Sequence, residues 1–147
     1  MNNQHLFWAG ILTALISITH IGIVIGGPEW YRFFGAGERM AQQAEAGLAL
    51  PVMITLTIAL ILGIWAIYAF SGAGLISRLP LLKPVLILIT SVFLLRGILG
   101  IPMVMLVDHP YLNELRDKIV FMVVSSLICL GFGILYAKGT MKLIFRQ

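Results

Sequence analysis

The sequence has little charge and a single cysteine. Only 11% of its 147 residues are Asp, Glu, Lys or Arg, whereas soluble domains average about 25%. Because Cys129 is the one cysteine, an intrachain disulfide and a CxxC redox or metal motif are both excluded. The Walker loop, GxGxxG, HExxH and GxSxG motifs are also absent. We therefore predict no cofactor, no metal site and no catalytic residue, and an enzyme is the less favoured class.

The sequence instead contains long apolar runs. The chain is 60% hydrophobic, and its apolar segments cover residues 6–26, 51–70, 84–107 and 119–137. Each segment reaches about the 20 residues that a membrane-spanning helix needs. We therefore predict an all-α fold, with residues 1–147 forming one polytopic membrane four-helix bundle. Residues 1–6 contain no Lys or Arg and no small-x-small cleavage site follows the first run, so we expect that run to remain as a helix.

The distribution of charge predicts the orientation in the membrane. The loop at 71–83 and the tail from residue 138 contain Lys and Arg but no acid. The other two loops hold all six acidic residues: Glu29, Glu38, Glu45, Asp108, Glu114 and Asp117. Short basic loops favour the cytoplasm, so we predict both termini inside, in a bacterial inner membrane. The net charge of +4 then reflects orientation, and no nucleic-acid partner is expected because no basic run is interleaved with aromatics.

The strongest functional signal is Arg96, in the middle of the third apolar segment. A charge at that depth costs roughly 3 kcal/mol on insertion scales. A buried partner, a water-filled cavity or an anionic ligand would offset this cost. Pro102 follows within two turns and predicts a kink in the outer half of the same helix. The alternative is a structural Arg96 that snorkels, or that pairs with Glu29 or Glu45 to hold the bundle together.

A polar stripe on the first apolar segment faces one side of its helix. Thr13, Ser17 and His20 are spaced i, i+4 and i+7. In one interpretation these side chains are satisfied within the bundle. In the other they line a cavity shared with Arg96, because the imidazole and the extended guanidinium reach similar depths. An acceptor would then be needed between the two groups: a carboxylate of Glu29, Glu38 or Glu45, a carbonyl freed near Pro102, or a bound anion.

The first outer loop is rich in aromatic and charged residues. Trp30, Tyr31, Phe33 and Phe34 suit a membrane–water interface. A Gly-Ala-Gly turn at 35–37 precedes helix-forming residues at 38–47. We predict a structured aromatic outer loop, either an anchor lying on the bilayer or a lid over a cavity. The predicted ligand-binding residues are Arg96, His20, Ser17, Glu45, Glu29, Trp30, Tyr31 and Arg32.

Two sequence runs carry a resemblance. These are Gly-Pro-Glu-Trp-Tyr-Arg-Phe-Phe-Gly-Ala-Gly-Glu at 27–38 and Leu-Leu-Arg-Gly at 94–97. They are similar to runs in small proteobacterial membrane proteins, and the whole layout loosely resembles the DoxX-like inner-membrane proteins. The resemblance implies four membrane helices with both ends inside. Some DoxX-like proteins are linked to quinone or thiosulfate redox chemistry.

Three function classes follow, of which we favour the first. It is a non-catalytic protein of envelope homeostasis that binds a lipid, quinone or other amphipathic anion in an outward-opening pocket at Arg96. The second is a small anion or solute transporter or channel acting as an oligomer, although the chain is short for a monomeric transporter. The third is a membrane-anchor subunit of an oxidoreductase. The expected partners are membrane lipids and either a second copy or a partner subunit, packed through Gly22, Gly26 and the small residues of the fourth segment.

Overall fold

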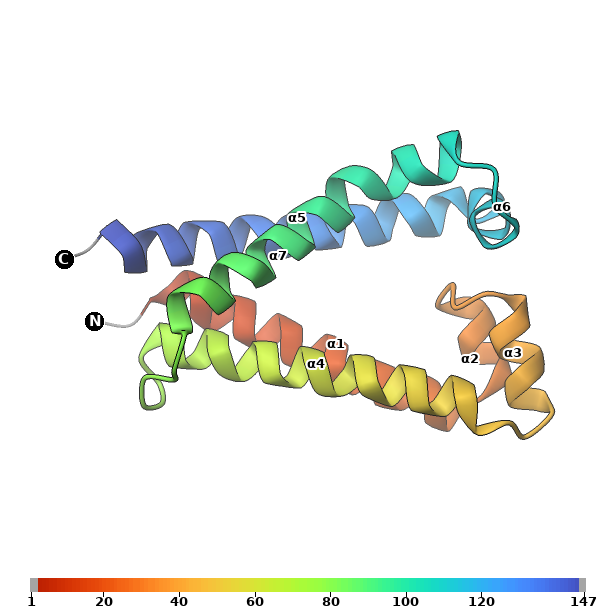
Figure 1. Cartoon of the computed structure of the whole chain (residues 1–147), viewed down its shortest axis with the longest axis horizontal. Coiled ribbons are helices and arrows are strands. Elements are labelled where there is room, and N and C mark those ends of the chain that lie inside the picture. The colour runs from red at the N-terminus through yellow and green to blue at the C-terminus, as the bar shows by residue number, and fades with distance from the viewer. Residues whose placement is uncertain (1–2, 146–147) are drawn as a thin grey trace.

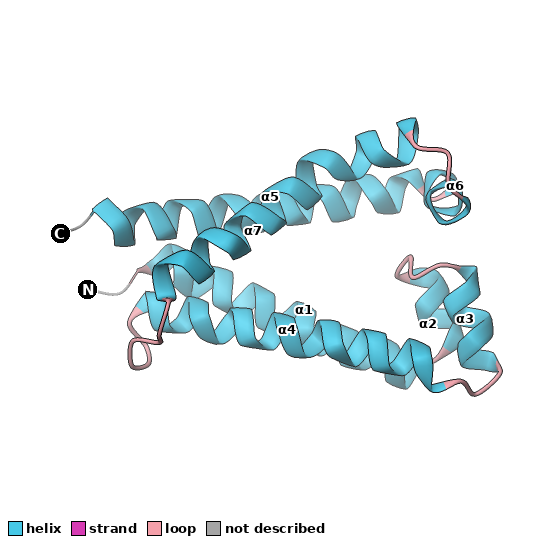
Figure 2. Ribbon diagram, in the orientation of Figure 1, coloured by secondary structure: helices cyan, strands magenta, loops and turns pink. Residues whose placement is uncertain are grey.

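The computed structural model describes residues 3–145, and that range is helical apart from short connections (Figure 1). The four long helices are α1 (Gln4–Gly26), α4 (Ala49–Ala73), α5 (Leu82–Leu106) and α7 (Ile119–Phe145). The three short helices are α2 (Pro28–Phe33), α3 (Glu38–Glu45) and α6 (Pro110–Asp117). No strand occurs between residues 3 and 145 (Figure 2). The prediction of an all-α fold is confirmed.

The four long helices are each long and apolar enough to cross a membrane. They contain 23 to 27 residues, so most of them extend past the apolar segments predicted from sequence. The clearest case is α7, which continues to Phe145 through Lys138 and Lys142. Lysine is a good helix former, so a basic helix end is compatible with continued helix. The length and composition of these helices are consistent with a multi-pass membrane protein.

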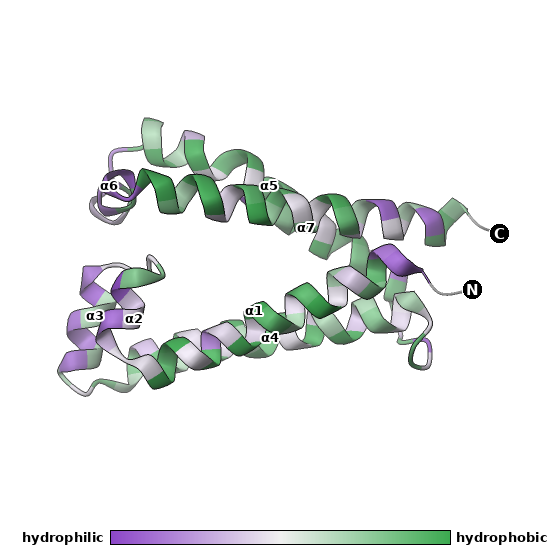
Figure 3. Cartoon of the chain, turned by 180° about the vertical axis from the view of Figure 1, so that it is seen from behind, coloured by the Kyte–Doolittle hydropathy of each residue, from purple (hydrophilic) through white to green (hydrophobic). Residues whose placement is uncertain are grey.

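The long helices form two pairs that diverge. α1 packs mainly against α4, and α5 mainly against α7. Figure 1 shows the pairs close together where the chain begins and ends, and separated where α2, α3 and α6 lie. We call the first the closed end and the second the open end. The hydrophilic residues of the open end are concentrated in α2, α3 and α6, whereas the long helices are mostly apolar (Figure 3).

The closed end is fixed by close packing around Leu6. This side chain is fully buried, and a Cβ on Gly72 or Gly139 would lie 2.6 or 2.5 Å from it. The two glycines therefore let α4 and α7 approach α1. The Asn3 side chain donates to the Gly139 carbonyl at 2.7 Å, and its backbone N–H donates to the Ala73 carbonyl at 3.2 Å. Three helices are thus tied at one end, and the pairs have freedom to separate only toward the other.

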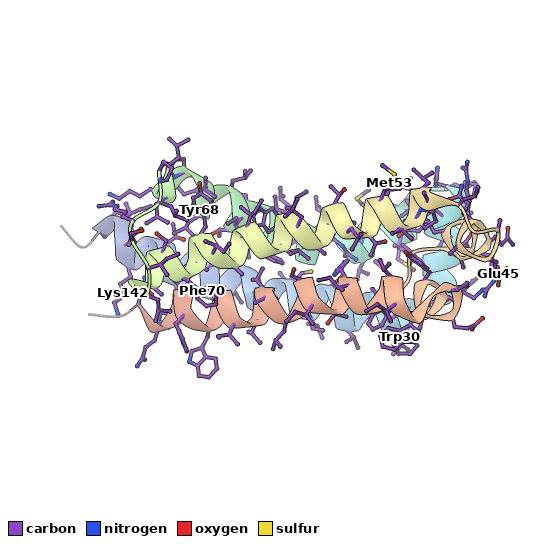
Figure 4. All side chains as sticks on the ribbon, turned by 90° about the horizontal axis from the view of Figure 1, so that it is seen from below. Trp30, Glu45, Met53, Tyr68, Phe70 and Lys142 are labelled. Atoms are coloured by element: carbon purple, nitrogen blue, oxygen red, sulfur yellow. The ribbon has the colours of Figure 1, made fainter. Side chains whose placement is uncertain are left out.

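The Gly22/Gly26 pair packs differently from the predicted helix–helix contact. Trp30, on α2, folds back so that its indole covers both glycines, and a Cβ on Gly26 would lie well under 3 Å from that ring. Figure 4 shows Trp30 against the outer side of α1. The glycine surface therefore accommodates a side chain of the same chain. Association with a second copy stays a prediction, but the Gly22/Gly26 pair no longer supports it.

Candidate functional site

A cavity of about 810 Å³ lies between the two helix pairs at the open end. This is within the size range of small-molecule pockets. Its walls come from α1 to α6, so both helix pairs and the short helices contribute. The polar side chains that line it are His20, Tyr31, Arg39, Thr55, Arg96, His109, Tyr111 and Glu114. The remaining walls are mostly aliphatic and aromatic.

Arg96 lines this cavity and extends toward the open end. Its Nη1 lies beside Gly100, one turn further along α5, so close that a Cβ on Gly100 would be well under 3 Å away. The guanidinium makes no ion pair within residues 3–145, where the ion pairs between side chains all belong to Arg32. No carboxylate of the described residues therefore offsets the cost of the Arg96 charge.

His20 reaches the same cavity from α1. Its Nδ1 lies 2.9 Å from the Ile16 carbonyl. A carbonyl oxygen can only accept, so Nδ1 is the donor of this hydrogen bond. Thr13 instead donates to Ala9 and pairs with Tyr136, and Ser17 donates to the Ala59 carbonyl of α4 at 2.7 Å. Of the predicted polar stripe, only His20 lines the cavity, and Ser17 joins α1 to α4.

Tyr31, in the segment between α1 and α4, lines the cavity and has a buried hydroxyl. It is 1% exposed, and its hydroxyl has no partner among the described residues. Trp30 and Phe33, on other sides of α2, are 45% and 73% exposed. Gly27, with a φ of 71°, and Pro28 at the first helical position start α2 in the orientation that turns Tyr31 inward. The helical period then separates a buried tyrosine from its exposed aromatic neighbours.

The predicted Glu29, Arg32 and Glu45 form an ion-pair network on the rim, outside the cavity lining. Arg32 contacts Glu29 at 2.7 Å, Glu38 at 2.9 Å and Glu45 at 2.8 Å, which holds α2 against α3. Figure 4 places Glu45 at the tip of the open end. The predicted alternative, in which Arg96 pairs with Glu29 or Glu45, is therefore not found. The hydrogen bond from Arg32 also holds the pKa of Glu38 below its ordinary value.

This network predicts an acid-sensitive contribution to stability. Because the pKa of Glu38 is lowered in the folded state, its contribution is present above the ordinary carboxyl pKa of about 4.3 and is lost as pH falls below that value. Arg32→Met should therefore lower the melting temperature more at pH 6 than at pH 3, with Arg78→Met as the charge-matched control at the closed end. A melting-temperature difference that does not change with pH would contradict this.

Five polar residues of the cavity lining are absent from the predicted ligand-binding residues: Arg39, Thr55, His109, Tyr111 and Glu114. Glu114 accepts a hydrogen bond from the backbone N–H of Glu38 at 2.8 Å, at the N-terminus of α3. A carboxylate is favourable there because the helix dipole is positive at that end. The Arg39 and Arg96 guanidiniums outnumber the Glu114 carboxylate, so the cavity walls carry a net positive formal charge. The contact spans 76 residues of sequence, so no local pattern could have indicated it.

Three long-range hydrogen bonds join the two sides of the cavity rim, and we call them the clasp. They are Glu38 N–H to Glu114, Tyr111 hydroxyl to the Gly35 carbonyl at 3.0 Å, and Lys118 Nζ to the Arg32 carbonyl at 2.6 Å. Burial raises the pKa of Tyr111; Arg96 opposes that shift and Glu114 adds to it. Tyr111 therefore stays protonated and can donate at neutral pH. The clasp joins the segment from α2 to α3, which connects α1 and α4, to α6 and the residue that follows it.

The clasp predicts a specific effect of Gly35→Ala. Gly35 has a φ of 72°, and an added Cβ would lie 2.6 Å from the Phe121 ring. Gly47→Ala is the matched control, because its φ is 70° but nothing lies within 4 Å of its Cβ position. Hydrogen exchange at the Glu38 amide should accelerate by about tenfold in Gly35→Ala relative to Gly47→Ala, as expected for about 1.4 kcal/mol of local opening. Equal exchange in the two variants would show that Gly35 does not hold the rim.

No protein family model, curated protein or solved structure matches this chain. The fold and the site define its class directly. It is an all-helical chain with four helices able to cross a membrane, arranged as two pairs around a cavity that contains cationic side chains. Within residues 3–145, no cluster of three or more His, Cys, Asp or Glu side chains is arranged to hold a metal ion.

Proposed function

We propose that this chain is a multi-pass protein of the bacterial inner membrane that binds an amphipathic anion non-catalytically in the cavity at Arg96. The observation that carries this proposal is the unpaired guanidinium on the wall of an 810 Å³ cavity with mostly apolar lining. A charge in a low-dielectric site is costly unless an opposite charge accompanies it. A lipid, quinone or other amphiphile with an anionic group would supply that charge, and its apolar part would suit apolar surroundings.

The polar groups around Arg96 support a ligand with oxygen atoms. Arg39 adds a second positive charge, and the Tyr31 hydroxyl and the His20 ring offer hydrogen bonds. Guanidinium groups bind carboxylate and phosphate oxygens in a bidentate geometry. The predicted sites Glu29, Glu45, Arg32, Trp30 and Ser17 would then act through the rim and the packing of the helices, without contacting the ligand.

The charge of the head group provides the direct test. The purified protein in a neutral detergent would be titrated with decyl phosphate, decanol and decyltrimethylammonium, and bound species counted by native mass spectrometry. We expect one saturable decyl phosphate, with decanol and decyltrimethylammonium at least about tenfold weaker, since a charge-assisted hydrogen bond contributes roughly 1.5–3 kcal/mol. Equal binding of the three amphiphiles would overturn the proposal.

The packing of the closed end supports binding rather than transport. Leu6, Leu86, Ile89 and Tyr136 are fully buried there, and the stacked rings of Phe93 and Tyr136 lie on the closed-end side of Arg96. A solute path through one copy of the chain would have to displace this core. An anion flux in proteoliposomes that depends on Arg96 would favour the transporter instead.

The distribution of charge supports an orientation with the closed end in the cytoplasm. The loop between α4 and α5 and the end of α7 contain Lys and Arg without an acid, whereas all six acidic residues lie at the open end. Positively charged loops are retained in the cytoplasm, so the cavity would open to the periplasm. In a Cys129→Ala background, a membrane-impermeant maleimide applied to whole cells should label Asp117→Cys and leave Ser77→Cys unlabelled. Labelling of both positions would contradict this topology.

A further inference from the structure

A second, smaller cavity shares two of its lining residues with the main cavity. It has a volume of about 320 Å³ and lies between α5, α6 and the start of α7. Arg96 and Tyr111 line both cavities, so the two spaces are adjacent across these side chains. The other lining residues are apolar: Leu95, Leu99, Gly100, Met103, Val104, Leu112, Leu115 and Met122.

Gly100 makes this adjacency possible. A Cβ at this position would meet the Arg96 guanidinium and would lie 2.7 Å from Ser126 Oγ. With glycine there, the guanidinium lies across the face of α5 at the boundary between the main cavity and the second one. The Ser126 hydroxyl beside it is buried and has no partner among the described residues. Arg96 and Tyr111 are thus the polar side chains of an otherwise apolar second cavity, and both lie where it adjoins the main one.

We infer that the second cavity holds the hydrocarbon chain of the ligand whose anionic group binds at Arg96, so that the ligand class is a single-chain alkyl, acyl or prenyl anion. This inference rests on the proposed function. The second cavity is at the lower limit of small-molecule pockets, which suits one chain and not a complete ligand. Its side chains are also partly open to the surroundings, with Leu99 and Met103 exposed by 44% and 47%. A chain could therefore enter sideways from the bilayer while the head group stays at Arg96.

Chain length and a filled cavity test this inference separately from the proposed function. Met103→Trp places a large ring in the second cavity, and Ile98→Trp is the matched control, because Ile98 is 57% exposed on α5 and lines neither cavity. Decyl phosphate and butyl phosphate would be titrated against each protein by native mass spectrometry. In the wild type and in Ile98→Trp, decyl phosphate should bind at least about tenfold more tightly, because each buried methylene adds favourable transfer free energy.

In Met103→Trp, the advantage of the longer chain should be lost while butyl phosphate binding stays at the wild-type level. Leu99→Trp is the second filling variant if Met103→Trp does not fold. Equal affinities for the two chain lengths in the wild type would overturn only the inference that the second cavity holds the hydrocarbon chain. A full chain-length advantage in the filled variants would do the same. If butyl phosphate does not bind the wild type, or binds Arg96→Leu equally well, the proposed function is overturned. The inference about the second cavity is then overturned with it.

Discussion

Arg96→Leu is expected to weaken binding of decyl phosphate strongly while the protein still accumulates in the membrane. The guanidinium is the unpaired charge on the cavity wall, and leucine removes both the charge and its hydrogen-bond donors. A charge-assisted hydrogen bond contributes roughly 1.5–3 kcal/mol, so its loss should lower the affinity at least about tenfold. The substitution also removes an insertion cost of roughly 3 kcal/mol, so protein levels should be equal to the wild type or higher.

Two further variants separate the role of the charge from its geometry. Arg78 is exposed like Arg96 but lines neither cavity, so Arg78→Leu makes the same change at the closed end and should leave binding unchanged. Arg96→Lys keeps the charge but loses the planar, bidentate donor set, so it should bind with intermediate affinity. A loss of folding in Arg96→Leu, detected as aggregation in detergent, would instead support a structural Arg96. Wild-type affinity in Arg96→Leu would remove the site.

Gly97→Ala is expected to destabilise the protein strongly, although it adds only one methyl group. Gly97 lies where α5 meets α7, and an added Cβ would be 2.6 Å from Leu130 Cγ and 2.9 Å from the Leu130 backbone nitrogen. A side chain can change its rotamer, but the backbone of α7 can move only if the helix pair separates. Overpacking of this kind costs about 1–3 kcal/mol of the free energy of unfolding. The variant should show a lower melting temperature and faster proteolysis.

Gly131→Ala is the control for Gly97→Ala within the same chain. Gly131 is also helical, but it is exposed and nothing lies within 4 Å of its Cβ position. Alanine favours helix over glycine by roughly 0.5–1 kcal/mol, so this variant should be as stable as the wild type or slightly more stable. Equal melting temperatures of the two variants would show that close approach at Gly97 does not hold α5 to α7.

Much of the secondary structure could be predicted from sequence because the cause is local. Apolar runs of membrane-spanning length need every backbone polar group satisfied internally, and a helix does this within one segment. The four long helices and the short helix from Glu38 are therefore predictable, with ends misplaced by a few residues. The exception is α7, whose end lies eight residues past the predicted 137. The end of a helix is set by capping and packing more than by hydrophobicity, so composition alone misplaces it.

The unusual position of Arg96 is also readable from sequence, because the cost of a charge depends mainly on its depth in an apolar segment. Its partners are not readable. The three glutamates between α1 and α4 are each possible acceptors by sequence, and all three contact Arg32 instead. Arg32 lies on α2 between them in space, a placement created by the turn at residues 35–37 that folds α3 back beside α2.

The sequence by itself determined the helices, their apolar character and the one charge that must be offset. Only the tertiary structure decided that the helices form two diverging pairs, that Tyr31 turns inward while Ser17 packs against α4, and that Glu114 and Tyr111 join the two sides of the rim. The physical reason is the range of the interactions. Helical periodicity restricts which face a residue occupies, but it carries no information about which residue 76 positions away will meet that face.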